Sequence, residues 1–153
     1  MKNDLVFKEG CLFCNIVRGI VPCFKVFEDE TSLAFLDHRP LFAGHTLFIT
    51  KSHLETLFDL PDAFIGALFT NVRLLSQAVM QGMKAEGTFV AINNRVSQSV
   101  PHFHVHIVPR RKRDGLKGFF WPRRTYQDQQ EIDAALRALH SAIAELRDSE
   151  RGA

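Results

Sequence analysis

Three histidines alternate with apolar residues within residues 100–109, at His102, His104 and His106. Strict alternation is typical of a β-strand, in which successive side chains point to opposite faces. The pattern therefore predicts three imidazoles on one face, roughly 7 Å apart, and an apolar face that packs on a core. Imidazole titrates near neutral pH and serves as a nucleophile, a proton donor or a metal ligand. Because the chain holds only seven histidines, this grouping predicts a chemical function rather than packing alone.

Two cysteines form a second group that could do chemistry, the Cys-x-x-Cys pair Cys11 and Cys14. Such a pair is typical of either a metal site or a redox site. The pattern of a strand, a helix and a second strand does not surround it, which argues against a thioredoxin-like site. Cys23 has no partner at metal-ligand spacing, so we expect a buried or partly exposed free thiol. Three cysteines cannot form a closed set of disulfides and favour a reducing, cytoplasmic location.

The composition is that of an ordinary globular protein. The chain has 153 residues, 46% of them hydrophobic and 24% charged, which suits one domain with a real core. A formal net charge of +2 is too small to predict nucleic-acid binding. Residues 1–10 lack the apolar region of a signal peptide, and no apolar run approaches the ~18 residues of a membrane span. We therefore expect a cytoplasmic protein without a membrane or a specific nucleic-acid partner.

The elements that must position these groups follow from the apolar patterning. Strands are expected at residues 24–27, 32–36, 45–50, 89–93 and 100–109. A short helix begins near Cys11 and ends at Gly19, and a long helix runs from Pro61 to about Lys84, closed by Gly87. The long helix carries one apolar stripe: Ile65, Leu68, Val72, Leu75 and Val79. Most strand connections are too short for crossovers, so we expect an α+β fold with a largely antiparallel sheet and one long crossover helix.

The C-terminal part combines a basic segment with a last helix. Arg110, Arg111, Lys112 and Arg113 are followed by three more basic residues, Lys117, Arg123 and Arg124. They favour a solvated face, and would attract phosphate only if they converge. The apolar cluster at residues 119–122 precedes a helix that begins near Asp128, with Glu131 as its capping-box partner. Its apolar stripe fits either core packing or a dimer seam: Ile132, Leu136, Leu139, Ile143 and Leu146.

Four sequence motifs in this order closely resemble the histidine-triad (HIT) family of nucleotide hydrolases and transferases. They are Phe-Leu-Asp-His-Arg-Pro at residues 35–40, Gly-His-Thr-Leu at 44–47, Lys-Ser-His at 51–53 and Gln-Ser-Val-Pro-His-Phe-His-Val-His at 98–106. The resemblance covers about residues 11–109. It implies a single HIT-like domain over residues 1–153, with a core at about 11–110 and a C-terminal segment and helix at about 111–148. It also implies a homodimer.

The resemblance gives the histidines separate roles. It implies that His104 attacks the α-phosphate of a nucleotide, and that His106 contacts this phosphate and helps the leaving group. Neutral imidazole is a competent nucleophile at pH 7, but one ring nitrogen must be free while the other keeps its proton. We predict that the carbonyl of His102 accepts the proton of the second nitrogen of His104 and so fixes the tautomer.

Eight further residues belong to the nucleotide site by resemblance. Three apolar side chains surround the base: Phe13, Ile16 and Phe35. Five polar side chains would contact the ribose and the phosphates: Asp37, His45, Asn93, Gln98 and Ser99. Asp37 would accept hydrogen bonds from the ribose hydroxyls, although an aspartate before Pro40 is also typical of a turn. Asn94 is the alternative to Asn93, because the family's glycine-bearing loop is shortened here to residues 94–97.

The zinc-bearing branches of the family combine a Cys-x-x-Cys pair with two histidines. The matching residues here are Cys11, Cys14, His53 and His102. Two thiolates and two imidazoles suit a closed, tetrahedral structural Zn²⁺ that joins the N-terminal helix to the sheet. His102 would then be a metal ligand, and His104 and His106 would remain for the chemistry.

The substrate implied is an adenine nucleotide conjugate: a nucleoside phosphoramidate, a dinucleoside polyphosphate or an acyl-type nucleotidyl conjugate. Two other functions fit the same residues. One is a zinc hydrolase that holds a catalytic metal on His102, His104 and His106, although alternate strand residues span too far for one ion to bind all three. The other is a non-catalytic, dimeric nucleotide-binding module.

Overall fold

The computed structural model describes residues 5–116 and 125–151. The chain divides into two compact units, Met1–Asp114 and Gly115–Ala153. The elements in chain order are α1 (Leu12–Val17), β1 (Lys25–Glu28), β2 (Ser32–Leu36), β3 (Thr46–Thr50), the 3₁₀ helix η1 (Leu57–Asp59), α2 (Asp62–Gly82), β4 (Gly87–Ala91), β5 (His104–Arg110) and α3 (Gln129–Arg151).

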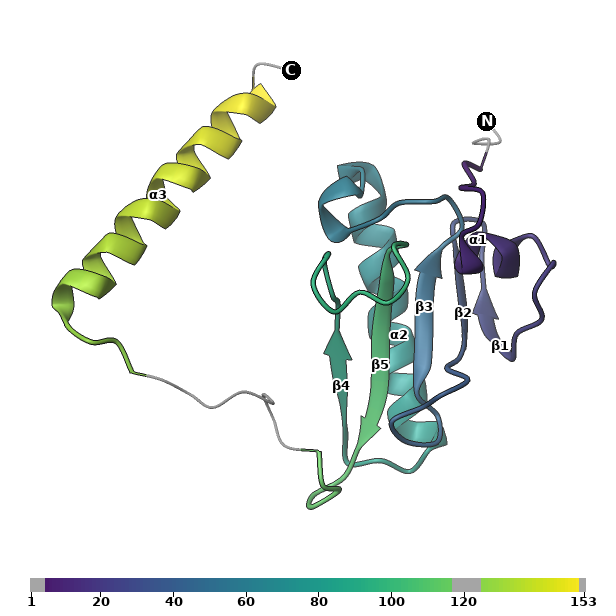
Figure 1. The fold of residues 1–153 in the computed structure, drawn as a ribbon. Coiled ribbons are helices and arrows are strands. Elements are labelled where there is room, and N and C mark those ends of the chain that lie inside the picture. The colour runs from purple at the N-terminus through teal and green to yellow at the C-terminus, as the bar shows by residue number, and fades with distance from the viewer. Residues whose placement is uncertain (1–4, 117–124, 152–153) are drawn as a thin grey trace. The chain divides into compact units, whose positions relative to one another are not determined.

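The first unit is built on a five-stranded sheet with the order β1-β2-β3-β5-β4 (Figure 1). Each neighbouring pair of strands is antiparallel. The long connection that contains α2 crosses from β3 to β4, and β5 then returns between these two strands. This arrangement confirms the predicted α+β fold with a largely antiparallel sheet and one long crossover helix.

One face of the sheet packs against α2. Phe48 of β3 lies opposite Val105 of β5 in the register, and both side chains are fully buried. They form a core cluster with four residues of the predicted stripe of α2, namely Leu68, Val72, Leu75 and Val79. The fifth residue of that stripe, Ile65, is 37% exposed and lies outside this cluster. By length and composition alone α2 could cross a membrane. Its contacts with β4 and β5 and its place in this cluster are those of a core helix.

The opposite face of the sheet packs against α1. Leu47 lies opposite His106 in the register and Ile49 lies opposite His104, so both histidines are on this face. A second core cluster covers it: Cys11, Phe13, Cys14, Ile16, Leu33, Phe35, Leu47 and Ile49. The fold thus places the cysteine pair and all three alternating histidines on the same side of the sheet.

The predicted boundaries of three elements are wrong. The strand expected at residues 89–93 is β4, which lies two residues earlier at Gly87–Ala91. Gly87 does not close α2, which ends at Gly82, because Lys84 adopts the left-handed conformation (φ 50°) that glycine usually supplies there. Gly87 instead begins β4, opposite Arg110. The histidine strand begins at His104 rather than before His102, since Pro101 has no N–H to donate to a neighbouring strand and disfavours regular backbone in the residue before it.

The second unit contains α3, which begins one residue after the predicted position. The carboxylate of Asp128 accepts a hydrogen bond from the backbone N–H of Glu131, as the capping prediction requires. Leu136 and Leu139 of its apolar stripe are 47% and 61% exposed. The basic residues Lys117, Arg123 and Arg124 and the apolar cluster at 119–122 lie outside the described residues. The prediction of a single domain over residues 1–153 stays a prediction.

Candidate functional site

His102 lies on the same side of the sheet as His104 and His106, as the alternation predicts, but its ring joins a different group of side chains. His102 precedes β5 and is fully buried, and its backbone N–H donates to the carbonyl of Val100. Its ring lies among the cysteines and His53, whereas the rings of His104 and His106 remain side by side with centroids 5.0 Å apart. The three histidines therefore divide between two neighbouring groups.

His104 is held in one tautomer. Its Nδ1 lies 2.7 Å from the carbonyl oxygen of His102, and a carbonyl can only accept, so the proton must be on Nδ1. This confirms the predicted hydrogen bond. The lone pair of a neutral ring is then on Nε2, which has no hydrogen-bond partner among the described residues. Burial lowers the pKa of His104 from its ordinary value and so favours the neutral form.

His106 is held in the opposite tautomer through His45. The backbone N–H of Leu41 donates to Nδ1 of His45, 3.2 Å away, so that the proton of neutral His45 is on Nε2. Nε2 of His45 lies 3.0 Å from Nδ1 of His106 and donates to it. The proton of neutral His106 is therefore on Nε2. Burial, followed by the neighbouring His104 and His45, lowers the pKa of His106 to about 4, and burial lowers that of His45.

Asp37 lies beside this pair of histidines. One carboxylate oxygen accepts from the backbone N–H of Arg39 at 2.9 Å, which is the turn interaction that the sequence favoured. The other oxygen lies 3.6 Å from Nδ1 of His45. The backbone N–H of Asp37 donates to the carbonyl of His45. Asp37 therefore sits at the edge of the histidine face, and its contact with a ribose stays a prediction.

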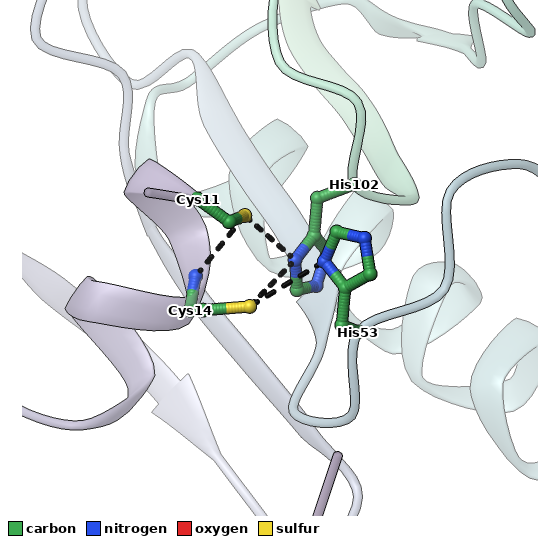
Figure 2. A group of neighbouring side chains, drawn as sticks. All are labelled: Cys11, Cys14, His53 and His102. Carbon is green, nitrogen blue, oxygen red and sulfur yellow. Dashed lines mark hydrogen bonds between the residues drawn. The ribbon is translucent and has the colours of Figure 1, made fainter. Parts of the chain in front are cut away.

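The four predicted metal ligands come together (Figure 2). Nδ1 of His102 lies 3.5 Å from Sγ of Cys11 and 3.7 Å from Sγ of Cys14. Nδ1 of His53 lies 3.4 Å from Sγ of Cys14. Sulfur and nitrogen ligands of a tetrahedral Zn²⁺, at about 2.3 and 2.0 Å from the metal, lie about 3.5 Å from each other. The spacing therefore fits a tetrahedral metal site.

The local structure explains why these ligands converge. Cys11 caps the N-terminus of α1, where its sulfur accepts from the backbone N–H of Cys14, and one helical turn brings both sulfurs to one side. Nε2 of His102 donates to the carbonyl of Thr50 at 2.8 Å, which leaves the lone pair of Nδ1 facing the sulfurs. Burial lowers the pKa of His102 to about 4, which favours the neutral, metal-binding form of the ring.

The three residues predicted around the base belong to the core on the histidine face. Phe13 and Phe35 are each 5% exposed and Ile16 is 9% exposed. The ring of Phe13 meets the rings of Phe35, His102 and His104 edge-on, with centroids 5.7, 5.8 and 5.3 Å apart. The ring of Phe13 therefore packs against two of the three alternating histidines. Their contact with a base stays a prediction.

The loop before the triad is held by its polar side chains. Nε2 of Gln98 donates to the carbonyl of Glu55, and Oε1 of Gln98 accepts from the backbone N–H of Arg95. Nδ2 of Asn93 donates to the carbonyl of Ser97, and Asn94 accepts from the backbone N–H of Leu57. Ser99 is exposed. The phosphate contacts of Asn93, Gln98 and Ser99 stay predictions.

Sequence reasoning identified the backbone carbonyl of His102 as the acceptor for His104, but it missed the backbone groups that fix the two other tautomers. The N–H of Leu41 and the carbonyl of Thr50 set the protons of His45 and His102, and neither depends on the side chain at its position. Backbone donors and acceptors have no sequence signature. η1 was also missed, although the capping box between Thr56 and Asp59 could have indicated it.

Two curated proteins are similar to this chain over most of its length. The chain is 39% identical over 111 residues to the adenylylsulfatase HINT3 of Arabidopsis thaliana, covering 71% of this chain and 56% of that protein. It is 37% identical over 126 residues to the adenosine 5'-monophosphoramidase HNT1 of Saccharomyces cerevisiae, covering 80% of this chain and 76% of that protein. These relatives are hydrolases that act on nucleotides.

Solved structures share the fold. SMU.412c of Streptococcus mutans UA159 superposes with a TM-score of 0.80 at 33% identity, over 90% of this chain and 87% of that chain. A Zn-bound histidine triad family protein of Mycobacterium smegmatis superposes with a TM-score of 0.66 at 37% identity, over 87% of this chain and 97% of that chain. The model of the HIT domain matches residues 18–113, which include His45, His53 and all three alternating histidines. The chain belongs to the HIT-domain family.

Proposed function

We propose that this protein is a nucleotide hydrolase or nucleotidyl transferase that cleaves at the α-phosphate through a nucleotidyl-histidine intermediate. One observation carries the proposal: His104 and His106 stand side by side in opposite tautomers. One presents a bare Nε2 and the other a protonated Nε2. A nucleophile beside a hydrogen-bond donor for the leaving group is a pair of groups suited to group transfer at phosphorus.

The reaction has two steps. Nε2 of His104 attacks the α-phosphorus, a phosphorus–nitrogen bond forms, and the bond to the leaving group breaks while the Nε2–H of His106 donates a hydrogen bond to the departing atom, which takes a proton from water. Water then attacks the same phosphorus, the phosphorus–nitrogen bond breaks, and a proton of this water passes to solvent as the nucleoside monophosphate leaves neutral His104. The hydrogen bond from Nδ1 of His104 to the carbonyl of His102 stabilises the positive charge that the ring gains during attack.

The substrate is an adenosine 5'-phosphate joined through its α-phosphate to an amine or to a second nucleotide. The relatives named as an adenylylsulfatase and an adenosine monophosphoramidase support an adenylyl group as the part that is transferred. Phe13 and Phe35 supply aromatic surface for the base, and Asp37 supplies a carboxylate for the ribose.

Cys11, Cys14, His53 and His102 would hold a structural Zn²⁺. Their spacing, and the lone pair of His102 that faces the sulfurs, support this assignment. Four protein ligands leave no open position, so the ion would supply a cross-link between α1 and the segment before β5 rather than a Lewis acid. Burial raises the pKa of the Cys14 thiol, so that binding must displace its proton.

The protein acts as a homodimer. β4 is the outermost strand of its sheet, and Val90 on this strand is 42% exposed. α2 also exposes three large apolar side chains, Ile65, Phe69 and Leu74. An edge strand and exposed apolar side chains on the neighbouring helix support a second copy as the partner.

The test offers adenosine phosphoramidate and diadenosine tetraphosphate to the wild type and to His104→Asn. Asparagine can still donate to the carbonyl of His102 but has no nucleophilic nitrogen. We expect turnover of both compounds to fall about 10³-fold or more, and the wild type but not the variant to form an adenylylated protein. His140→Asn, on the exposed part of α3, is the control and should retain full turnover.

The same assay separates the two other functions. A non-catalytic module would bind adenosine monophosphate without turning over either compound. A zinc hydrolase would lose activity on chelation while His104→Asn retained it. Two groups of the described residues could hold a metal: one is Cys11, Cys14, His53 and His102, and the other is Asp37, His45 and His106. Neither group includes His104 or joins His102 to His106, which argues against one metal bound by the three alternating histidines.

A further inference from the structure

His53 enters the metal cluster through one ring nitrogen and leaves the other without a partner. Its Nδ1 lies 3.4 Å from Sγ of Cys14. Its Nε2 is shielded from solvent and forms no hydrogen bond with the residues that the structure describes. A neutral imidazole carries one proton, so a metal on Nδ1 requires the proton on Nε2. Because solvent does not reach this atom, only a protein group can accept that proton.

A carboxylate stands next to the unpaired nitrogen. Oε1 of Glu55 lies 3.8 Å from Nε2 of His53, which is about 1 Å longer than a charge-assisted hydrogen bond. Only Leu54 separates the two residues in the chain. The side chain of Glu55 is 50% exposed. A hydrogen bond to the ring requires a side-chain rotation that shortens this distance by about 1 Å.

Lys8 contacts both the carboxylate of Glu55 and the sulfur of Cys14. Its Nζ lies 2.6 Å from Oε1 of Glu55, and its backbone N–H donates to Sγ of Cys14 at 3.4 Å. One lysine therefore contacts a metal ligand through its backbone and the carboxylate beside another ligand through its side chain. Glu55 is held near His53 even before it bonds to the ring.

We propose that Glu55 is a positioning residue of the metal site, whose carboxylate accepts the hydrogen bond from Nε2 of His53 and holds Nδ1 toward the metal. This role rests on the proposed Zn²⁺ site. A carboxylate behind a metal-binding imidazole fixes the tautomer and the orientation of the ring, and makes the ring a stronger ligand. It also removes the unpaired buried polar group that His53 otherwise carries.

The test is the Zn²⁺ affinity of the full chain, measured by competition with a chromophoric chelator. Glu55→Ala should weaken binding about 10- to 100-fold, whereas Glu55→Gln, which keeps an acceptor oxygen, should lose less. Glu28→Ala is the matched control. Glu28 also pairs with lysines, Lys25 and Lys51, so its removal deletes the same charge away from the cluster, and affinity should stay within about twofold.

A second variant separates the hydrogen bond from the ion pair. Lys8→Met removes the lysine but leaves the carboxylate free for His53, so it should weaken binding far less than Glu55→Ala. In NMR spectra, the imidazole N–H of His53 in the Zn²⁺-loaded wild type should give a downfield signal that moves upfield in Glu55→Ala.

Three outcomes decide the matter. An affinity of Glu55→Ala within twofold of the wild type would overturn the role of Glu55, and so would an equal loss in Lys8→Met. A wild type that binds no Zn²⁺ would overturn the metal site itself, and the role of Glu55 with it. The adenylyl-transfer chemistry of His104 is measured separately and would stand in each case.

Discussion

His106 makes the folded protein sensitive to acid. Its pKa is lowered to about 4 from an ordinary value of 6.5, first by burial and then by the neighbouring histidines. Between these two values the unfolded chain binds a proton at this position and the folded protein does not. The free energy of unfolding therefore falls as the pH drops from about 6.5 toward 4, and the contribution is fully present above that window.

The size of the effect follows from the two pKa values. One pKa unit corresponds to about 1.4 kcal/mol, so His106 alone should lower the free energy of unfolding by about 2 kcal/mol between pH 7.5 and pH 5. The matched variant is His106→Asn, because the side-chain oxygen of asparagine can accept from Nε2 of His45 in place of Nδ1 and does not titrate.

Urea denaturation of both proteins measures the difference. Both are stripped of metal, so that loss of metal at low pH affects neither. The wild type should lose about 2 kcal/mol more than His106→Asn between pH 7.5 and pH 5. Parallel pH dependences, with a difference below about 0.5 kcal/mol, would refute the reasoning, because they would mean that His106 titrates in the folded protein as it does in the unfolded chain.

Two further predictions concern the loop before β3. His45→Phe removes the donor to Nδ1 of His106, and kcat for adenosine phosphoramidate should fall about 10²-fold with little change in KM; a change confined to KM would contradict the tautomer argument. Gly44→Ala should destabilise the protein by about 1–3 kcal/mol in thermal unfolding, because its φ is +91° and an added Cβ would lie 2.5 Å from Cγ of Met83. Gly66→Ala in α2, where an added Cβ meets nothing within 4 Å, is the control and should be neutral or stabilising.

The sequence predicted the elements well where one periodic pattern ran without interruption. The stripe from Leu68 to Val79 forms the buried face of α2, and residues 32–36 form β2 within the predicted bounds. Alternation also placed the imidazoles of His104 and His106 on one face, because that face depends only on the period of a strand. It also placed His102 on the correct face, but it began the strand too early, because alternation does not show that Pro101 keeps the residues before His104 out of the ladder.

The sequence predicted which side chains form the site better than it predicted their hydrogen-bond partners. Spacing and resemblance brought together Cys11, Cys14, His53 and His102. The direction in which Gln98 points was not accessible, because Arg95 and Ser97 take left-handed conformations (φ 68° and 59°) that the sequence does not signal at residues other than glycine. The groups that orient the rings are mostly backbone atoms, and their positions follow from tertiary structure alone.

The ring and the backbone carbonyl of His102 contact different groups, so a substitution of His102 disturbs both sets of contacts at once. Its ring faces the sulfurs of the cysteine pair, while its backbone carbonyl receives the proton of His104. The ring and the carbonyl belong to the same residue. A substitution that removes the ring therefore also removes the contacts that hold the carbonyl in position. A loss of activity in a His102 variant would not separate the two causes. Replacing Cys11 removes a metal ligand and leaves the carbonyl in place, so the cysteine rather than the histidine is where the two contributions can be measured apart.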